Sequence, residues 1–127
     1  MVRSRLIEAV LFDDGARDIE AEGRRCEVIP GDVTDPAFCR EAVARTVQAF
    51  GHLDILVNNA AFQLHAHSIE DVSDERLEET LRTNVGGYFS MARAALPHLR
   101  PGASILNTGS VVGLRGSGEL PDYAATK

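Results

Sequence analysis

The chain has 127 residues, 44% of them hydrophobic and 25% charged, which fits at most one soluble globular domain. A net charge of −6 and a pI near 5.1 argue against a nucleic-acid groove or an anionic membrane surface as a partner. No apolar run approaches the roughly 20 residues that span a bilayer, and the start of the chain lacks the apolar core of a signal peptide. Cys26 and Cys39 form no C-x-x-C pair, so we expect free thiols in a reducing cytoplasm.

The first 24 residues are the least informative part of the sequence. The segment Arg5–Phe12 is compatible with a helix or with a short strand. An acidic residue after an apolar strand can hold an adenosine ribose in dinucleotide-binding folds, but we favour a solvated turn for Asp13 and Asp14. The segment Ala16–Glu22 is predicted to be a helix, with Gly23 as its C′ residue.

From Arg25 onward, strand and helix patterns alternate. Cys26–Pro30 is predicted to be a short strand. The helix Ala37–Phe50 follows, with Asp35 as its N-cap and Pro36 at its first position. Leu53–Val57 is almost entirely apolar, which is typical of a strand buried on both faces.

The segment Phe62–Val72 is predicted to be a loop, and it holds His65 and His67. Two histidines at this spacing could bind a metal, but no third ligand is apparent. We therefore interpret them as surface residues or as part of the lip of a cleft.

A long helix is predicted from Asp74 to Leu99, after a capping start at Ser73 in which Arg76 stands where Glu would be expected. Asn84 and the pair Gly86-Gly87 interrupt it. A glycine costs roughly 1 kcal/mol relative to alanine inside a helix, so we expect close packing or a local bend there. The predicted apolar side of the helix consists of Leu77, Leu81, Val85, Tyr88, Ala92, Ala95, Leu96 and Leu99.

After a turn at Pro101-Gly102, the strand Ala103–Asn107 leads to Ser110, at the strand end where open α/β sheets bind ligands. Tyr123 and Lys127 are four residues apart, so they share one face of a helix. A hydroxyl, a phenol and an ammonium that converge there suit proton transfer to or from a carbonyl or alcohol oxygen. The order strand, helix, strand, helix, strand, start of helix predicts an α/β fold with a right-handed, doubly wound, Rossmann-like parallel sheet.

Four landmarks in this order resemble the short-chain dehydrogenase/reductase family, over about residues 21–127. They are Gly31-Asp32-Val33, Asn58-Asn59-Ala60-Ala61, Asn84 in the long helix, and Ser110 with Tyr123 and Lys127. The segments Ile29-Pro-Gly-Asp-Val33 and Leu96-Pro-His-Leu-Arg-Pro-Gly102 are similar to the bacterial branch of sugar-alcohol and general-stress dehydrogenases. Two positions depart from the family pattern, because Ala61 replaces a usual glycine and Gly109 replaces a usual serine or alanine.

The resemblance implies a cytoplasmic enzyme that transfers hydride between NAD or NADP and a small alcohol or carbonyl substrate, from a family whose intact members are homo-oligomeric. It implies that Tyr123 is the general acid/base, that Lys127 stabilises the phenolate and binds the nicotinamide ribose, and that Ser110 holds the substrate oxygen. It also implies that Asn84 anchors a water in the proton relay. By the same resemblance the cofactor is bound by Asp32 and Val33 at the adenine and by Asn59, Ala60 and Ala61 along its length.

The sequence lacks one part of this pattern. No glycine-rich turn for the pyrophosphate precedes Arg25, and Gly113, Gly116 and Gly118 lie in the loop that faces substrate in the family. The strands correspond by resemblance to the third, fourth and fifth of the family's sheet, so we expect a partial domain, truncated at both ends, with open apolar edges prone to aggregation. The alternative to an active enzyme is a truncated chain that binds no cofactor.

Overall fold

The computed structural model describes residues 15–127, and these form parts of two compact units, residues 1–31 and Asp32–Lys127. The expectations for Arg5–Phe12, Asp13 and Asp14 lie outside the described residues. In the first unit, residues 15–21 are helical and Gly23 adopts a φ of 71° after the helix, as predicted. The strand expected at Cys26–Pro30 is wrong, since this segment is extended but no strand among the described residues pairs with it.

In the second unit, two parallel strands form the sheet, β1 (Leu53–Asn58) and β2 (Leu99–Asn107). The pairing Leu56↔Ile105 fixes the register near the carboxyl ends. β2 begins four residues before the predicted strand and includes Pro101 and Gly102. These two residues lie in a bulge of β2. Leu53 pairs with Leu99 and Ile55 pairs with Ser104, so β2 has more residues than β1 between these two pairs. The turn predicted at Pro101-Gly102 is therefore an irregularity inside the strand.

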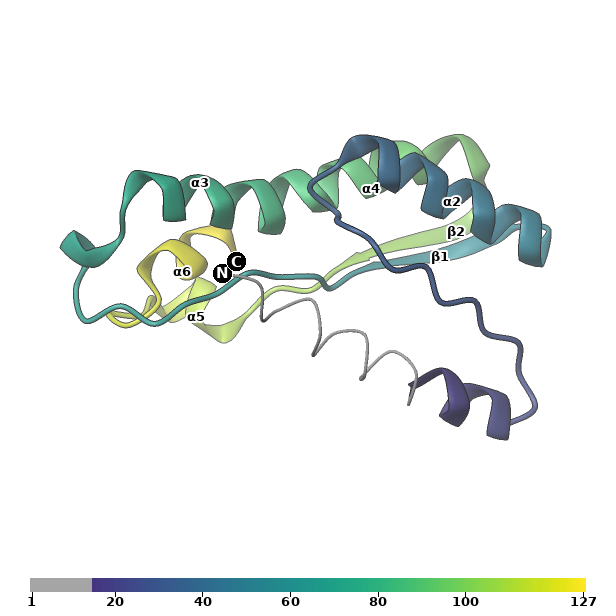
Figure 1. The fold of residues 1–127 in the computed structure, drawn as a ribbon, viewed down its shortest axis with the longest axis horizontal. Coiled ribbons are helices and arrows are strands. Elements are labelled where there is room, and N and C mark those ends of the chain that lie inside the picture. The colour runs from purple at the N-terminus through teal and green to yellow at the C-terminus, as the bar shows by residue number, and fades with distance from the viewer. Residues whose placement is uncertain (1–14) are drawn as a thin grey trace. The chain divides into compact units, whose positions relative to one another are not determined.

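Helix α2 (Pro36–Phe50) covers one face of this sheet together with α4 (Tyr88–Ala95) (Figure 1). The start of α2 is as predicted, with the Asp35 carboxylate accepting the Ala37 N–H at 2.8 Å. Val43, Leu56 and Ala95 form the buried centre, and the partly buried side chains around it are Val47, Leu53, Met91, Ala92, Ala94, Leu99 and Ile105.

The opposite face of the two strands is open among the described residues. Ile55 and Val57 are each 59% exposed, and Leu106 is 50% exposed. The alternation with buried Leu56 follows from the two-residue period of a strand. A parallel sheet is normally covered on both faces. These apolar side chains therefore indicate a face that is suited to being covered, although no described residue covers it.

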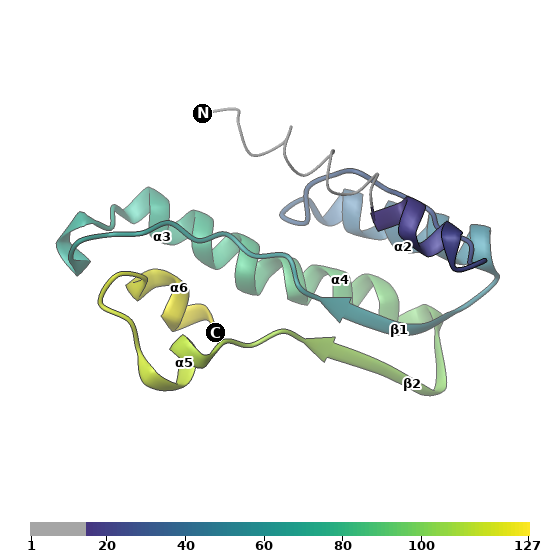
Figure 2. The ribbon, with the colours of Figure 1, turned by 90° about the horizontal axis from the view of Figure 1, so that it is seen from below.

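The predicted long helix is one continuous rod of four segments, which Figure 2 shows from below. These are α3 (Asp74–Leu81), the π-helical η2 (Arg82–Gly87), α4 and the 3-10 turn η3 (Leu96–His98). The interruption expected at Asn84 and Gly86-Gly87 is the π-helical segment. A Cβ built on Gly87 would lie 3.0 Å from the Val33 Cγ2 atom, so close packing also requires glycine there.

The apolar side predicted for this helix is partly wrong. Its exposed members are Leu77 (38%), Leu81 (44%), Val85 (48%) and Leu96 (61%). The buried line instead consists of small and polar residues, namely Thr80, Asn84, Gly87 and Ala95. Hydrophobic periodicity missed this line because two of its members are buried through hydrogen bonds and not through apolar contact.

Three short helices complete the second unit: η1 (Ile69–Asp71), α5 (Val111–Arg115) and α6 (Pro121–Thr126). Two of them lie where loops were predicted, η1 in the segment with the two histidines and α5 in the glycine-containing segment after β2. Cys26 and Cys39 are free thiols, as expected. None of the helices in the described part of the chain is long and apolar enough to cross a membrane.

Candidate active site at the carboxyl ends of the strands

The two strand ends are tied together by asparagines. The Asn58 Nδ2 donates to the Asn107 Oδ1 at 2.8 Å, and the Thr108 N–H donates to the Asn58 carbonyl at 2.9 Å. Asn58 is only 4% exposed. The segments that follow both strands therefore start side by side, and they contain the predicted residues Asn59 and Ser110. The sequence reasoning did not assign a role to Asn58, although its two-residue spacing from Leu56 places both on the buried face.

Ser110 is the N-cap residue of helix α5. Its Oγ accepts the Val112 N–H at 3.4 Å, which leaves the hydroxyl proton free to be donated elsewhere. Gly113, one turn into α5, lies directly against the end of α6, since a Cβ built on it would come within 2.2 Å of the Lys127 carbonyl carbon. Only glycine permits this approach. It brings the Ser110 helix and the end of the Tyr123 helix together.

Tyr123 lies in α6, and Lys127 directly follows the last helical residue. The Lys127 Nζ lies 5.7 Å from the centre of the Tyr123 ring and 4.6 Å from that of Tyr88, both within the range of a cation–π contact. It also donates to the Tyr88 hydroxyl at 2.7 Å and to the Thr108 carbonyl at 3.0 Å. The ammonium group therefore lies within cation–π range of two phenol rings, next to the residue that follows β2. The sequence reasoning placed Tyr88 only on the apolar side of a helix and missed this contact.

Asn84 is 1% exposed and connects the long helix with two other segments. Its Oδ1 accepts the Phe62 N–H at 2.7 Å, and its Nδ2 donates to the Phe62 carbonyl at 3.0 Å and to the Thr126 Oγ at 2.9 Å. The Thr126 hydroxyl in turn donates to the Tyr123 carbonyl at 2.8 Å. Both N–H donors of Asn84 are therefore used by protein groups, and a water bound by this side chain would have to donate to Oδ1.

A second buried cluster, which the sequence reasoning missed, lies at the start of α6. The Asp122 carboxylate accepts hydrogen bonds from the Arg76 Nε at 3.0 Å and the Arg76 Nη2 at 2.8 Å, and from the Thr80 hydroxyl at 2.7 Å. Burial raises the pKa of Asp122, but the hydrogen bonds from Arg76 and Thr80 outweigh it and hold this pKa below its ordinary value. Arg76 also donates to the carbonyls of Leu64 and His65.

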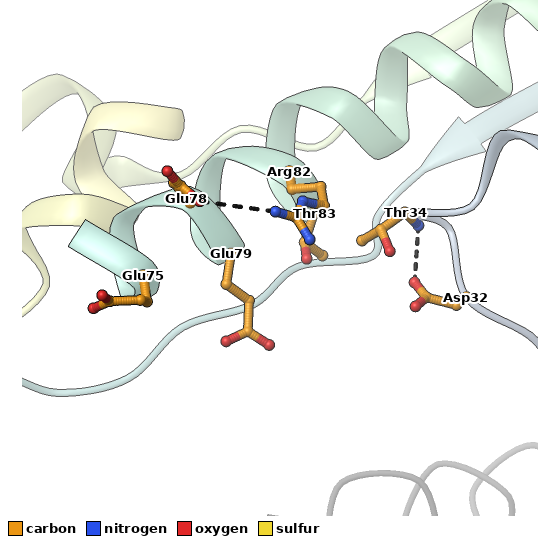
Figure 3. A pocket seen from close by; sticks show the side chains of 7 residues that line it. All are labelled: Asp32, Thr34, Glu75, Glu78, Glu79, Arg82 and Thr83. Atoms are coloured by element: carbon orange, nitrogen blue, oxygen red, sulfur yellow. Dashed lines mark hydrogen bonds and ion pairs between the residues drawn. The ribbon is translucent and has the colours of Figure 1, made fainter. Parts of the chain in front are cut away.

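The predicted adenine residues lie on the other side of the long helix. The Asp32 carboxylate accepts the Thr34 N–H at 2.8 Å, as in a turn, and Val33 packs against Gly87. Figure 3 shows the hollow that Asp32 borders, lined among the described residues by Asp32, Thr34, Glu75, Glu78, Glu79, Arg82 and Thr83. Arg82 is its only cation and lies 3.9 Å from the Glu78 carboxylate. Four carboxylates against one guanidinium do not suit a pyrophosphate.

The residues present fit part of a dinucleotide. Asn59, Ala60 and Ala61 are exposed directly after β1, and the Lys127 ammonium, which lies beside Thr108 just after β2, is a group that can donate to a ribose hydroxyl. The phosphate turn is absent from the sequence. The interpretation of the histidines as surface residues fits the structure, where His65 lies 3.4 Å from an exposed Glu119 carboxylate. Residues 15–127 contain no cluster of three or more His, Cys, Asp or Glu that could hold a metal.

Comparison with known proteins identifies the family to which this chain belongs. The family model for short chain dehydrogenases matches residues 8–127, and the chain belongs to that family. The uncharacterized oxidoreductase YhdF of Bacillus subtilis is 49% identical over 91% of this chain and 40% of its own length. The glucose and ribitol dehydrogenase of Daucus carota is 51% identical over 70% of this chain and 31% of its own length.

Among solved structures, a short chain dehydrogenase from Burkholderia cenocepacia in complex with NADP has a TM-score of 0.84 and 39% sequence identity. The match covers 91% of this chain and 47% of that protein. The chain thus spans less than half the length of each of these three relatives.

Proposed function

We propose that this chain supplies the central part of an oxidoreductase that transfers hydride between NAD(P)(H) and a small alcohol or carbonyl compound. The observation that carries the proposal is the position of the Lys127 ammonium, 5.7 Å from the Tyr123 ring at the carboxyl ends of both strands. The matched relatives include a glucose and ribitol dehydrogenase and an NADPH-dependent aldehyde reductase, which favours sugar alcohols, sugars or aldehydes as substrates. The free cysteines fit a reducing cytoplasm.

In this proposal Tyr123 is the general acid and base. Its phenol donates a proton to the substrate carbonyl during reduction and removes a proton from the alcohol during oxidation. Lys127 stabilises the phenolate through its positive charge. The Ser110 hydroxyl donates a hydrogen bond to the substrate oxygen and stabilises the charge that develops on it. The bound nicotinamide supplies the hydride chemistry.

Asn84, Asn59, Ala60 and Ala61 support this centre. Asn84 holds Thr126 and thereby the Tyr123 carbonyl, and any water of the proton relay would donate to its Oδ1. The exposed residues 59–61 would lie along the cofactor. Asp32 and Val33 would contact the adenine, in a setting whose acidic residues favour a neutral base over a phosphate.

A chimera tests this proposal, because the chain spans less than half of its relatives. We would replace the matching segment of the 49% identical Bacillus subtilis relative with this chain and assay carbonyl reduction with NADH and NADPH. Tyr123→Phe should reduce kcat at least about 100-fold, since general acid–base groups contribute typically 100- to 10,000-fold. Cofactor affinity, measured by calorimetry, should change little, because the substitution removes only a hydroxyl.

Two outcomes would contradict the proposal. A folded chimera that binds cofactor but keeps most of its rate with Tyr123→Phe would place the acid elsewhere. A folded chimera that binds neither cofactor would favour the alternative, in which this chain does not support cofactor binding. The Tyr88→Phe variant is the matched control, because it removes the same atom from the other phenol beside Lys127, and we expect it to retain a larger share of the activity.

A further inference from the structure

Helix α6 depends on contacts from outside for its orientation. Its N-cap residue Leu120 makes no side-chain hydrogen bond to it, so no local cap fixes the start of this helix. The direction in which Tyr123 points is therefore determined by the groups that hold α6 in place.

Two polar anchors hold α6 against the long helix, and they lie on either side of Tyr123. Thr126 receives the Asn84 hydrogen bond after Tyr123, and Asp122 receives the hydrogen bonds of Arg76 and Thr80 directly before it. Both views of the fold show α6 beside α3 (Figures 1 and 2). Asp122 and Tyr123 are adjacent in sequence, so a displacement of the carboxylate also displaces the phenol.

The burial of this ion pair argues for a role beyond stability. The side chains of Asp122 and Arg76 are 1% and 13% exposed. Replacing a buried ion pair with apolar residues is often neutral or stabilising, so such a pair is weak evidence for stabilisation. Apolar contacts would not fix the geometry in the way that the Arg76 guanidinium does. This group donates two hydrogen bonds to the Asp122 carboxylate and others to the carbonyls of Leu64 and His65.

We propose that Arg76, Asp122 and Thr80 form a positioning device for Tyr123, which fixes α6 so that the phenol faces the substrate position near Ser110. This inference deepens the proposed function and rests on it, because it assigns no new reaction. The proposed function assigns none of the three residues to the substrate or the cofactor. They act through the position of Tyr123, so their loss should reduce kcat more than it changes KM.

The test uses the chimera described above, with kcat and KM measured for Asp122→Asn, Thr80→Val and Thr80→Ser. A displacement of about 1 Å at a reacting group can cost roughly 100-fold in rate. We expect Asp122→Asn to lower kcat about 10- to 100-fold with KM within about threefold. Thr80→Val should lower kcat less, and Thr80→Ser, which keeps the hydroxyl, should restore it. Thr80→Val removes only one of the hydrogen bonds to the Asp122 carboxylate. It is the test variant if Asp122→Asn does not fold.

Asp54→Asn is the matched control, because the Asp54 carboxylate, 2.9 Å from the His52 Nε2 atom, is exposed at the opposite end of β1. It should leave kcat and KM unchanged. Folded Asp122→Asn or Thr80→Val variants with the original kcat would overturn the positioning proposal alone. An original chimera without activity would count against the proposed function instead. In that case, amide hydrogen exchange at Tyr123 and Thr126 tests the positioning proposal. Faster exchange in the Asp122→Asn variant would support it, and unchanged protection would overturn it.

Discussion

Buried polar side chains determine how the candidate site is assembled. Thr80, Asn84 and Asp122 are 0%, 1% and 3% exposed, which makes them as buried as the apolar core. Within residues 15–127, no buried side-chain nitrogen or oxygen lacks a hydrogen-bond partner. Because an unsatisfied buried polar group costs about 1–3 kcal/mol, each of these residues specifies one arrangement of its neighbours.

The Asp122 carboxylate should make the stability of the chain depend on pH. Its pKa in the folded protein is held below its ordinary value by the hydrogen bonds from Arg76 and Thr80, so the unfolded chain binds this proton more readily. The pair therefore contributes its full stability above about pH 4, and that contribution is lost as the pH falls through the lowered pKa. Asp122→Asn should cost about 3 kcal/mol at pH 7, the low end for breaking a buried pair, since Arg76 keeps two carbonyl acceptors.

Urea unfolding of the original chain and of Asp122→Asn between pH 2 and pH 7 would measure this. The difference in unfolding free energy should shrink as the pH falls below 4. A difference that stayed constant with pH would show that the carboxylate contributes nothing through its charge. Asp54→Asn provides the baseline, because the Asp54 side chain is 60% exposed.

At this scale the sequence predicted residues whose chemistry is visible in a pattern. Ser110, Tyr123 and Lys127 were found because a strand end and a four-residue helical spacing place them together. Their catalytic roles remain predictions. Asp122 and Tyr88 were missed, because their partners Arg76 and Lys127 lie 46 and 39 residues away in the chain. No local pattern encodes a contact over that distance.

Among the elements, the π-helical segment η2 connects the site with the predicted adenine region. Asn84 within it faces α6, and Gly87 at its end faces Val33. A π-helical turn is rare and is frequently found at functional sites. The two glycines make its packing testable, since a Cβ built on Gly86 has no neighbour closer than the Leu81 carbonyl oxygen at 3.8 Å.

Alanine substitutions at the two positions should have opposite effects. Gly87→Ala would force Val33 Cγ2 to move from a distance of 3.0 Å and should destabilise the chain by about 1–3 kcal/mol, as overpacking does. Gly86→Ala adds helix propensity without a clash and should stabilise it by up to about 1 kcal/mol. Thermal unfolding of both variants would measure this. Equal effects would mean that the segment containing Val33 does not pack on Gly87 in solution.

Element types and boundaries were predictable where local signals are strong. The start of α2 follows from Asp35 and Pro36, and its end follows from Gly51 with a φ of 84°. The strand expected at Cys26–Pro30 is wrong for a non-local reason, because a strand requires a neighbouring strand and the described residues provide none for it. The helix α5 was missed because its glycine and short length weaken the helical signal.

For the unit formed by Asp32–Lys127 as a whole, the sheet has one covered face and one open face. α2 and α4 bury Leu56, whereas Ile55, Val57 and Leu106 on the opposite face are half exposed or more. Such a surface beside unpaired strand edges favours association. The sequence predicts this hazard, since apolar strands without their neighbours in the family's sheet leave open edges.

Val57→Lys should therefore reduce self-association of the 127-residue chain. Val57 is 59% exposed at the centre of the open face, and burying a valine contributes about 1.5–3 kcal/mol, so the concentration at which the 13.7 kDa chain associates should rise at least about tenfold. Leu114→Lys is the matched control. It changes the net charge from −6 by the same single unit, but it lies on α5 and is 90% exposed. Light scattering and sedimentation over a concentration series would measure both variants, and an equal effect of the two would show that charge, not the open sheet face, governs association.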